Sequence, residues 1–193
     1  MKRDLGFLAM LVIGALGMGS GWAAAADFRL SAPAFGDGAT IPAVDEYHGD
    51  GCLGGNVSPE LHWSGVPAGT KSFVLTVHDP DAPAPGGWWH WVRFDIPAGL
   101  RALPAGLSGL PADLPGSAGM GSDGMQSFGE ARYGGPCPPP GDRPHHYDFV
   151  LRALDVAIVP GASAATTGPQ LQRLVAGHVL GEARLTGRFA RPR

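Results

Sequence analysis

Residues 72–96 read SFVLTVHDPDAPAPGGWWHWVRFDI, and most of this stretch alternates between two faces. Residues 72–78 and 89–96 repeat with a period of two and are rich in aromatic and β-branched side chains, which is typical of β-strands. The predicted faces are Phe73, Leu75 and Val77 in the first strand, and Trp89, Trp91, Arg93 and Asp95 opposite His90, Val92, Phe94 and Ile96 in the second.

The later part of the chain supplies two more strand patterns and one helix. Residues 146–156 and 182–190 alternate in the same way. A helix is predicted after Thr166 or Thr167, with Pro169 in its first turn. The apolar faces are Tyr147, Phe149, Leu151 and Ala153 in the third strand, Ala183, Leu185, Gly187 and Phe189 in the fourth, and Leu171, Leu174, Val175, His178 and Val179 in the helix.

The segments between these elements are dominated by glycine and proline, notably at 97–125 and 133–145. No alternation of strands with helices is present, which argues against a parallel dinucleotide-binding fold. The pattern therefore predicts a mainly antiparallel β-sandwich with long loops and one late helix.

The composition is compatible with one globular domain. The 193 residues include 31 Gly and 19 Pro, but 44% of the chain is hydrophobic, 16% is charged and the net charge is −3. Such a chain buries enough apolar surface to offset its conformational entropy. It lacks the basic character of a nucleic-acid-binding domain.

Residues 1–26 have the features of a secretory signal. Lys2 and Arg3 precede an apolar stretch that is shorter than a membrane span, and small residues close it at Ala23–Ala26. We predict cleavage, a mature domain at 27–193 and a periplasmic or secreted location. The alternative is an uncleaved N-terminal anchor.

Export gives meaning to the two cysteines. Cys52 and Cys137 would meet an oxidising compartment, where paired thiols become disulfides. A bridge between them would close a loop of about 86 residues and stabilise the fold by roughly 4–5 kcal/mol in the chain-entropy model. A catalytic thiol and two free, buried thiols are the alternatives.

Familiar enzyme motifs are weak or missing. Residues 119–124 spell GMGSDG, the letters of the dinucleotide fingerprint, but no strand is predicted before it and no helix after it. We therefore predict no cofactor and no metal, although two histidines and a carboxylate leave a metal site open on ligand type alone.

Polar groups lie instead beside three rigid loops. Asp79-Pro-Asp-Ala-Pro83 follows a strand, Gly86–Trp91 contains His90, and Gly134–Gly141 leads to His145-His-Tyr147. Prolines fix the chain and glycines permit close approach to a ligand. Individually, these residues are also typical of turn caps and satisfied core side chains. Together they predict a small polar pocket.

These strings resemble the phosphatidylethanolamine-binding protein family. The resemblance extends from about Phe28 to Phe189. Within the family, the sequence most specifically resembles the bacterial Raf kinase inhibitor-like branch of YbhB/YbcL type. It is carried, in family order, by Asn56-Val-Ser-Pro59 with Leu61-His-Trp63, Asp79-Pro-Asp-Ala-Pro83, Gly87-Trp-Trp-His90, Tyr133-Gly-Gly-Pro-Cys-Pro-Pro-Pro-Gly141 and His145-His-Tyr147.

The resemblance implies a Greek-key β-sandwich with an anion pocket for phosphate-like head groups. His146 stands where the family often has Arg, and the C-terminal helix of eukaryotic relatives has no clear counterpart. An inhibited partner enzyme and a homodimer stay open. The pocket residues implied by motif are Asp79, Asp81, Pro83, Trp88, His90, Gly135, Pro136, His145 and Tyr147.

The first functional expectation is a non-enzymatic, exported binding protein for a small anion or phospholipid head group. Because histidines donate to anionic oxygens, binding is expected to strengthen as pH falls from about 7.5 to 5.5. The alternative is a hydrolase or lyase using His90, His145 and Asp79 as general acid and base.

Overall fold

The computed structural model describes residues 27–108 and 119–193, so the predicted signal at 1–26 lies outside the described residues. Its largest sheet has five antiparallel strands in the order β10-β9-β5-β6-β8. Because β9 returns to lie beside β5, the order 9-5-6-8 is a Greek key. The strands are β5 (Ser72–Asp79), β6 (Trp88–Pro97), β8 (Ser122–Asp123), β9 (His145–Leu154) and β10 (Val179–Phe189).

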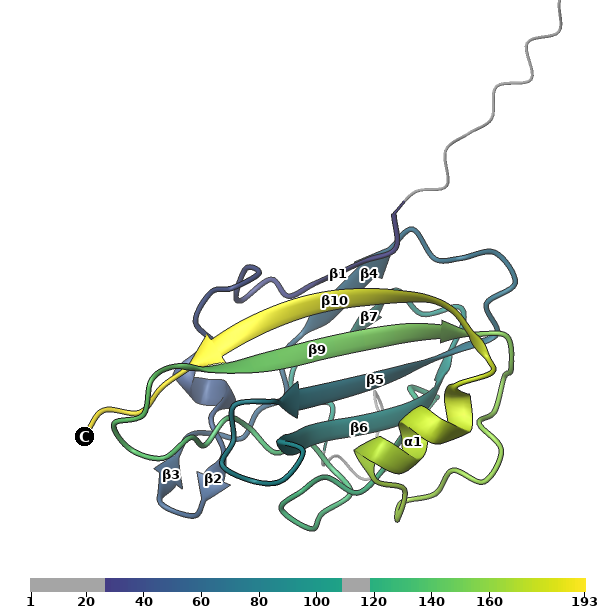
Figure 1. The fold of residues 1–193 in the computed structure, drawn as a ribbon. Coiled ribbons are helices and arrows are strands. Elements are labelled where there is room, and N and C mark those ends of the chain that lie inside the picture. Colours follow the sequence, from purple (N-terminus) through teal and green to yellow (C-terminus); the bar gives the residue numbers. More distant parts are fainter. Residues whose placement is uncertain (1–26, 109–118) are drawn as a thin grey trace, which may run out of the picture.

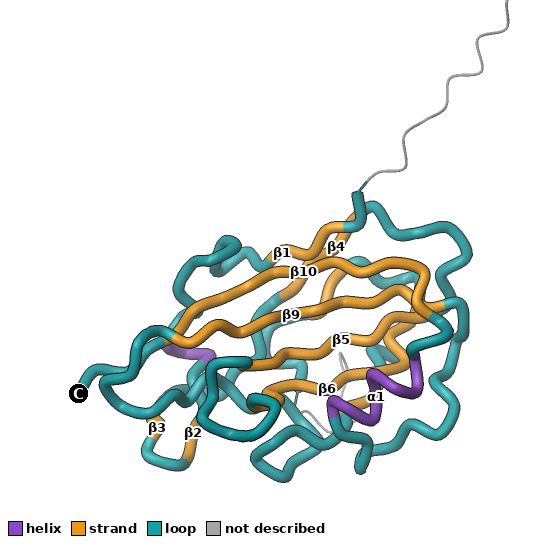
Figure 2. Tube along the Cα trace, viewed as in Figure 1, coloured by secondary structure: helices purple, strands orange, loops and turns teal. Residues whose placement is uncertain are grey.

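A three-stranded sheet packs against one face of the large sheet (Figures 1 and 2). Leu30, Leu61 and Trp63 of the small sheet share one buried cluster with Phe73 and Phe149 of the large one. The predicted β-sandwich is therefore confirmed. The small sheet comprises β1 (Arg29–Ser31), β4 (Leu61–Ser64) and β7 (Ala102–Leu103). A separate hairpin comprises β2 (His48–Gly49) and β3 (Cys52–Leu53). It follows a short 3₁₀ turn, η1 (Ala43–Asp45).

The helix α1 (Gly168–Val175) covers the opposite face of the large sheet, where Leu171 and Val175 join a second buried cluster. Thr167 caps it, since its backbone N–H donates to the Gln170 side chain (2.8 Å). The helix ends earlier than its predicted stripe, because β10 already begins at Val179. Among the described residues, no helix is long and apolar enough to span a bilayer.

Two bulges in β6 overturn the alternation predicted for that strand. Between Val77 and His78 of β5 the partners move from Trp91 to Trp89, which leaves His90 as an extra residue. A second register shift lies near Asp95, whose φ is 56°. A bulge reverses the faces that follow it, so Trp89 packs in the helix-side cluster whereas Trp91 packs in the sandwich core.

Candidate functional site

Four strand ends meet at one end of the large sheet. The register pairs Asp79, the last residue of β5, with Trp88, the first of β6, and pairs His145 with Phe189. A cavity of about 340 Å³ opens at this end. It is lined by Asp50, Asp79, Ala82, Pro83, Ala84, Trp88, His90, Phe128, Cys137, Pro138, Pro139, His145 and Arg191.

Asp79 and His145 form a buried pair in this cavity. Nδ1 of His145 donates to Oδ2 of Asp79 at 2.8 Å. The other carboxylate oxygen accepts the backbone N–H groups of Asp81 (2.8 Å) and Ala82 (3.1 Å). Both oxygens of Asp79 therefore accept hydrogen bonds from the protein, and the carboxylate fixes the orientation of the His145 imidazole.

His90 is buried against a loop of glycines. Its Nδ1 lies 2.8 Å from the carbonyl oxygen of Gly134 and 3.0 Å from that of Gly135. Its Nε2 is buried and has no hydrogen-bond partner within the described part of the chain. Burial lowers the pKa of His90 to about 4, although the nearby glycine carbonyls and Asp79 act in the opposite direction. The imidazole is therefore neutral near pH 7.

The glycine loop is held in place from behind. Asn56, with a φ of 50°, accepts the N–H of Gly135 at 2.8 Å and donates to the carbonyl of Tyr133 at 3.1 Å. A Cβ on Gly135 would lie 1.9 Å from the carbonyl oxygen of Asp45. This close approach explains why glycine occupies the position that presents a carbonyl to His90.

Asp81 lies beside the cavity rather than in its lining. Its carboxylate accepts the Nδ1–H (2.6 Å) and backbone N–H (2.9 Å) of His146 and pairs with Arg143 at 2.5 Å. Burial alone would raise its pKa, but these hydrogen bonds and the Arg143 charge lower the pKa of Asp81 to about 2. Arg143 thus brings a guanidinium next to His146, the position where the resembling family often has Arg.

Two aromatic side chains complete the polar part of the site. Trp88 lines the cavity, and its buried Nε1 has no acceptor among residues 27–108 and 119–193. Tyr147 packs behind His90, with ring centroids 5.0 Å apart in an edge-to-face arrangement. Burial and the charge of Asp79 raise the pKa of the Tyr147 hydroxyl, which stays protonated.

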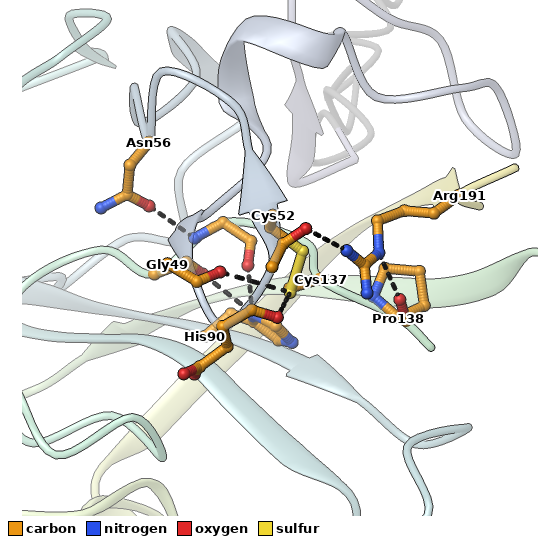
Figure 3. Close-up of a disulfide and its surroundings, with 11 residues drawn as sticks. Gly49, Cys52, Asn56, His90, Cys137, Pro138 and Arg191 are labelled. Carbon is orange, nitrogen blue, oxygen red and sulfur yellow. Dashed lines mark hydrogen bonds between the residues drawn. A yellow bond between two sulfur atoms is a disulfide. The ribbon is translucent and has the colours of Figure 1, made fainter. Parts of the chain in front are cut away.

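The opposite wall is built by a disulfide and the C-terminal segment. Cys52 and Cys137 are bridged, with Cα atoms 5.9 Å apart, which joins the β2–β3 hairpin to the proline-rich loop (Figure 3). Arg191 ties the same two segments by donating to the carbonyls of Gly51 (2.6 Å) and Pro138 (2.7 Å). The predicted pairing of the two cysteines is therefore present in the structure.

The predicted site residues fall into two groups. Asp79, Pro83, Trp88, His90 and His145 line the cavity. The other predicted residues do not line the cavity but lie next to it. Gly135 and Tyr147 contact His90. The Pro136 carbonyl accepts the N–H of Tyr47, and Asp81 binds His146.

Sequence reasoning missed Asp50, Phe128 and Arg191, which also line the cavity. Asp50 could have been found, because a bridge from Cys52 to Cys137 brings its neighbours to the proline-rich loop. Phe128 and Arg191 carry no local signal and reach the cavity only through the tertiary fold.

Residues 119–124, which spell the dinucleotide fingerprint, form no phosphate loop. They contribute β8, whose Asp123 accepts from the buried guanidinium of Arg93 at 2.8 Å. The carbonyls of Met120 and Gly121 accept further N–H groups of Arg93. Within the described residues, no group of three or more His, Cys, Asp or Glu side chains is arranged to hold a metal ion.

Comparisons with known proteins agree on one family. The family model described as phosphatidylethanolamine-binding protein matches residues 31–190. The chain is 44% identical over 152 residues to the UPF0098 protein YbcL of Escherichia coli K12, covering 77% of this chain and 82% of YbcL. It is 40% identical over 169 residues to the putative lipoprotein LppC of Mycobacterium tuberculosis H37Rv, covering 86% of this chain and 74% of LppC.

Solved structures give the same result for the fold. The crystal structure of E. coli YbcL, described as a new member of the mammalian PEBP family, matches with a TM-score of 0.80 and 38% identity, covering 86% of this chain and 99% of YbcL. The putative PEBP homologue CT736 of Chlamydia trachomatis matches with a TM-score of 0.70 and 32% identity, covering 85% and 97%.

Proposed function

Because this chain belongs to the phosphatidylethanolamine-binding protein family, we propose that it is a binding protein whose cavity takes a small anion of the phosphate head-group type. The observation that carries the proposal is a pair of buried polar atoms in the cavity lining, Nε1 of Trp88 and Nε2 of His90, without partners in the described residues. Buried polar atoms are normally hydrogen-bonded, and a ligand in the cavity would supply the partners that these two atoms lack.

The size and chemistry of the cavity support a small ligand. About 340 Å³ is at the lower end of the range for small-molecule sites. Arg191 supplies a cation and Trp88 a neutral donor, whereas Phe128 and the prolines supply apolar walls. A compact charged group with a short apolar extension matches this lining.

Titration calorimetry of the mature protein with phosphoethanolamine tests the proposal. We expect saturable binding to one site. His90→Ala should weaken it at least tenfold. His62→Ala should leave it unchanged, because His62 is an exposed residue of β4 that contacts Glu60. Equal binding by both variants, or no binding by the wild type, contradicts a ligand in this cavity.

The proposal includes export to the periplasm or beyond. The signal-like residues 1–26, the Cys52–Cys137 disulfide and the similarity to a putative lipoprotein support it. Cell fractionation with N-terminal sequencing of the recovered protein tests it. A cytoplasmic protein that retains Met1–Ala26 contradicts cleavage and export.

The Asp79–His145 pair supports a second candidate, a hydrolase or lyase. A carboxylate that orients a histidine is an arrangement for general acid–base catalysis. Among the residues that the structure describes, no serine, threonine or free cysteine lines the cavity to act as a nucleophile. Product formation from phosphoethanolamine that His145→Gln abolishes would favour the enzyme, whereas unchanged ligand recovered after binding favours the binding protein.

A further inference from the structure

The hydrogen on His90 has a fixed position. Nδ1 faces the carbonyl oxygens of Gly134 and Gly135 at 2.8 and 3.0 Å, and both of these groups only accept. The hydrogen must therefore be on Nδ1. Because a neutral imidazole carries one N–H, its Nε2 presents a lone pair and can only accept.

A second proton on this ring is strongly disfavoured. Complete burial lowers its pKa to about 4, and the charge of His78 acts in the same direction, whereas Asp79 opposes both. Asp79 already accepts hydrogen bonds from His145 and from two backbone N–H groups. In the described part of the chain, Asp50, His145 and Arg191 also line the cavity with His90, and Tyr147 packs against its ring.

For His90, this differs from the expectation that the histidines of the pocket donate to anionic oxygens. At pH 5.5 to 7.5 the ring is neutral, and its only unused polar atom is an acceptor. A fully deprotonated oxyanion would place an oxygen lone pair against the lone pair of Nε2. A ligand that carries its own hydrogen would instead donate to it.

Resting on the proposed function, we propose that the cavity selects phosphate monoesters in their monoanionic, singly protonated form, whose P–OH donates to Nε2 of His90. Sulfate and phosphate diesters carry no such hydrogen and are rejected. Charge favours the same form, because the carboxylates of Asp79 and Asp50 repel a dianion more than a monoanion. Trp88 and Arg191 supply the donors for the remaining, unprotonated oxygens.

The proposal fixes the pH dependence of binding. A phosphate monoester loses its second proton with a pKa of about 6. Above that pH the monoanion falls tenfold per unit, so the apparent affinity should fall about tenfold between pH 7 and pH 8. Below about pH 6 the affinity should level off, because the ligand is already singly protonated.

Calorimetry with three probes tests the selectivity: phosphoethanolamine, sulfate and dimethyl phosphate. At pH 7 we expect phosphoethanolamine to bind at least tenfold more tightly than either of the others. Repeating the titration in buffers of different ionisation enthalpy should show the uptake of nearly one proton with phosphoethanolamine at pH 8. Sulfate bound as tightly as phosphoethanolamine, or a flat affinity from pH 8 to pH 6, overturns the proposal.

Two variants separate this role of His90 from a structural one. His90→Gln supplies an amide that can turn to donate, so sulfate should gain at least tenfold relative to phosphoethanolamine and the pH dependence should flatten. His78→Gln is the control, because His78 contacts the carbonyl of Gly86 outside the cavity lining; it should keep both properties. If His90→Gln fails to fold, the probe selectivity and proton uptake of the wild type still test whether the cavity selects a singly protonated ligand.

The outcomes also separate this inference from the proposed function. Binding of all three probes with equal affinity keeps an anion site and rejects the selection of a protonated ligand. Binding of none rejects both. Vesicles containing phosphatidic acid, a lipid monoester, compared with soluble phosphoethanolamine distinguish a membrane source from a free head group, since only vesicle binding would cause the protein to co-sediment.

Discussion

Nδ1 of His145 lies 2.8 Å from Oδ2 of Asp79, and both side chains are about 97% buried. The two residues are 66 positions apart in the sequence, at the end of β5 and the start of β9. Their contact holds together two of the loops that form the cavity. It also leaves Nε2 of His145 toward Asp142, 3.5 Å away.

Asp79→Asn should disrupt this relationship. Oδ1 must still accept two backbone N–H groups, so the new amide nitrogen would face the Nδ1–H of His145. We expect a loss of about 1.5–3 kcal/mol in the free energy of unfolding, the usual range for a hydrogen bond to a charged group. Urea denaturation measures it, with Asp142→Asn as an exposed control expected to change stability by less than about 1 kcal/mol. Equal effects would contradict a special role for Asp79.

Asp81 should make stability fall in acid. Its pKa is lowered to about 2 in the fold, against 3.8 as the reference value. The ionised, hydrogen-bonded form therefore stabilises the protein fully above about pH 4, and this contribution is lost as pH falls toward 2. Asp81→Asn should be less stable than wild type at pH 6, and the difference should shrink between pH 4 and pH 2. A difference that stays constant over this range would contradict the assignment.

Asp45 should behave in the opposite way. Burial raises its pKa to about 6, and its Oδ2 has no partner in the described segments. Its contribution is most favourable below pH 4 and is lost as pH rises through 6. Asp45→Asn should thus be more stable than wild type at pH 8, by up to about 3 kcal/mol from 1.36 kcal/mol per pKa unit. Denaturation curves at pH 4 and 8 check this; a gain at pH 4 as large as that at pH 8 would contradict it.

The sequence allowed the main strands to be predicted because their burial has a period of two. Residues 72–78 were predicted and β5 is Ser72–Asp79, since hydrophobic alternation is a local property. The prediction of which β6 side chains share a face was wrong. The bulges at His90 and near Asp95 depend on the pairing of β6 with β5 and on the loops beyond it. A bulge leaves no reliable mark in a single sequence.

The same distinction between local and tertiary properties applies to the candidate site. Asp79, His90 and His145 stood out because each adjoins a proline- or glycine-rich loop next to a strand, and antiparallel pairing brought those loops to one end of the sheet. The state of His90 could not be predicted. It depends on two carbonyl groups 44 and 45 residues away and on burial by the folded chain.

Gly135→Ala should damage the fold and the cavity together. The new Cβ would lie 1.9 Å from the Asp45 carbonyl oxygen and 2.5 Å from the backbone nitrogen of Tyr47, and backbone atoms cannot turn away as a side chain can. We expect a loss of about 3 kcal/mol or more and weaker phosphoethanolamine binding, because the carbonyl that orients His90 must shift. Gly36→Ala, with no atom within 4 Å of its Cβ, is the matched control. Wild-type stability in both variants would contradict the packing described.

Reduction of the disulfide should loosen the cavity wall without unfolding the protein. Removing the Cys52–Cys137 link releases a loop constraint worth roughly 4 kcal/mol in the chain-entropy model. Arg191 still joins Gly51 to Pro138, the neighbours of the two cysteines. Reduction and Arg191→Ala should therefore be non-additive, with a combined loss that exceeds the sum by about 0.5–3 kcal/mol, as expected for coupled contacts. Thermal unfolding of the four combinations measures this coupling. Strictly additive losses would mean that the two ties act on independent parts of the wall.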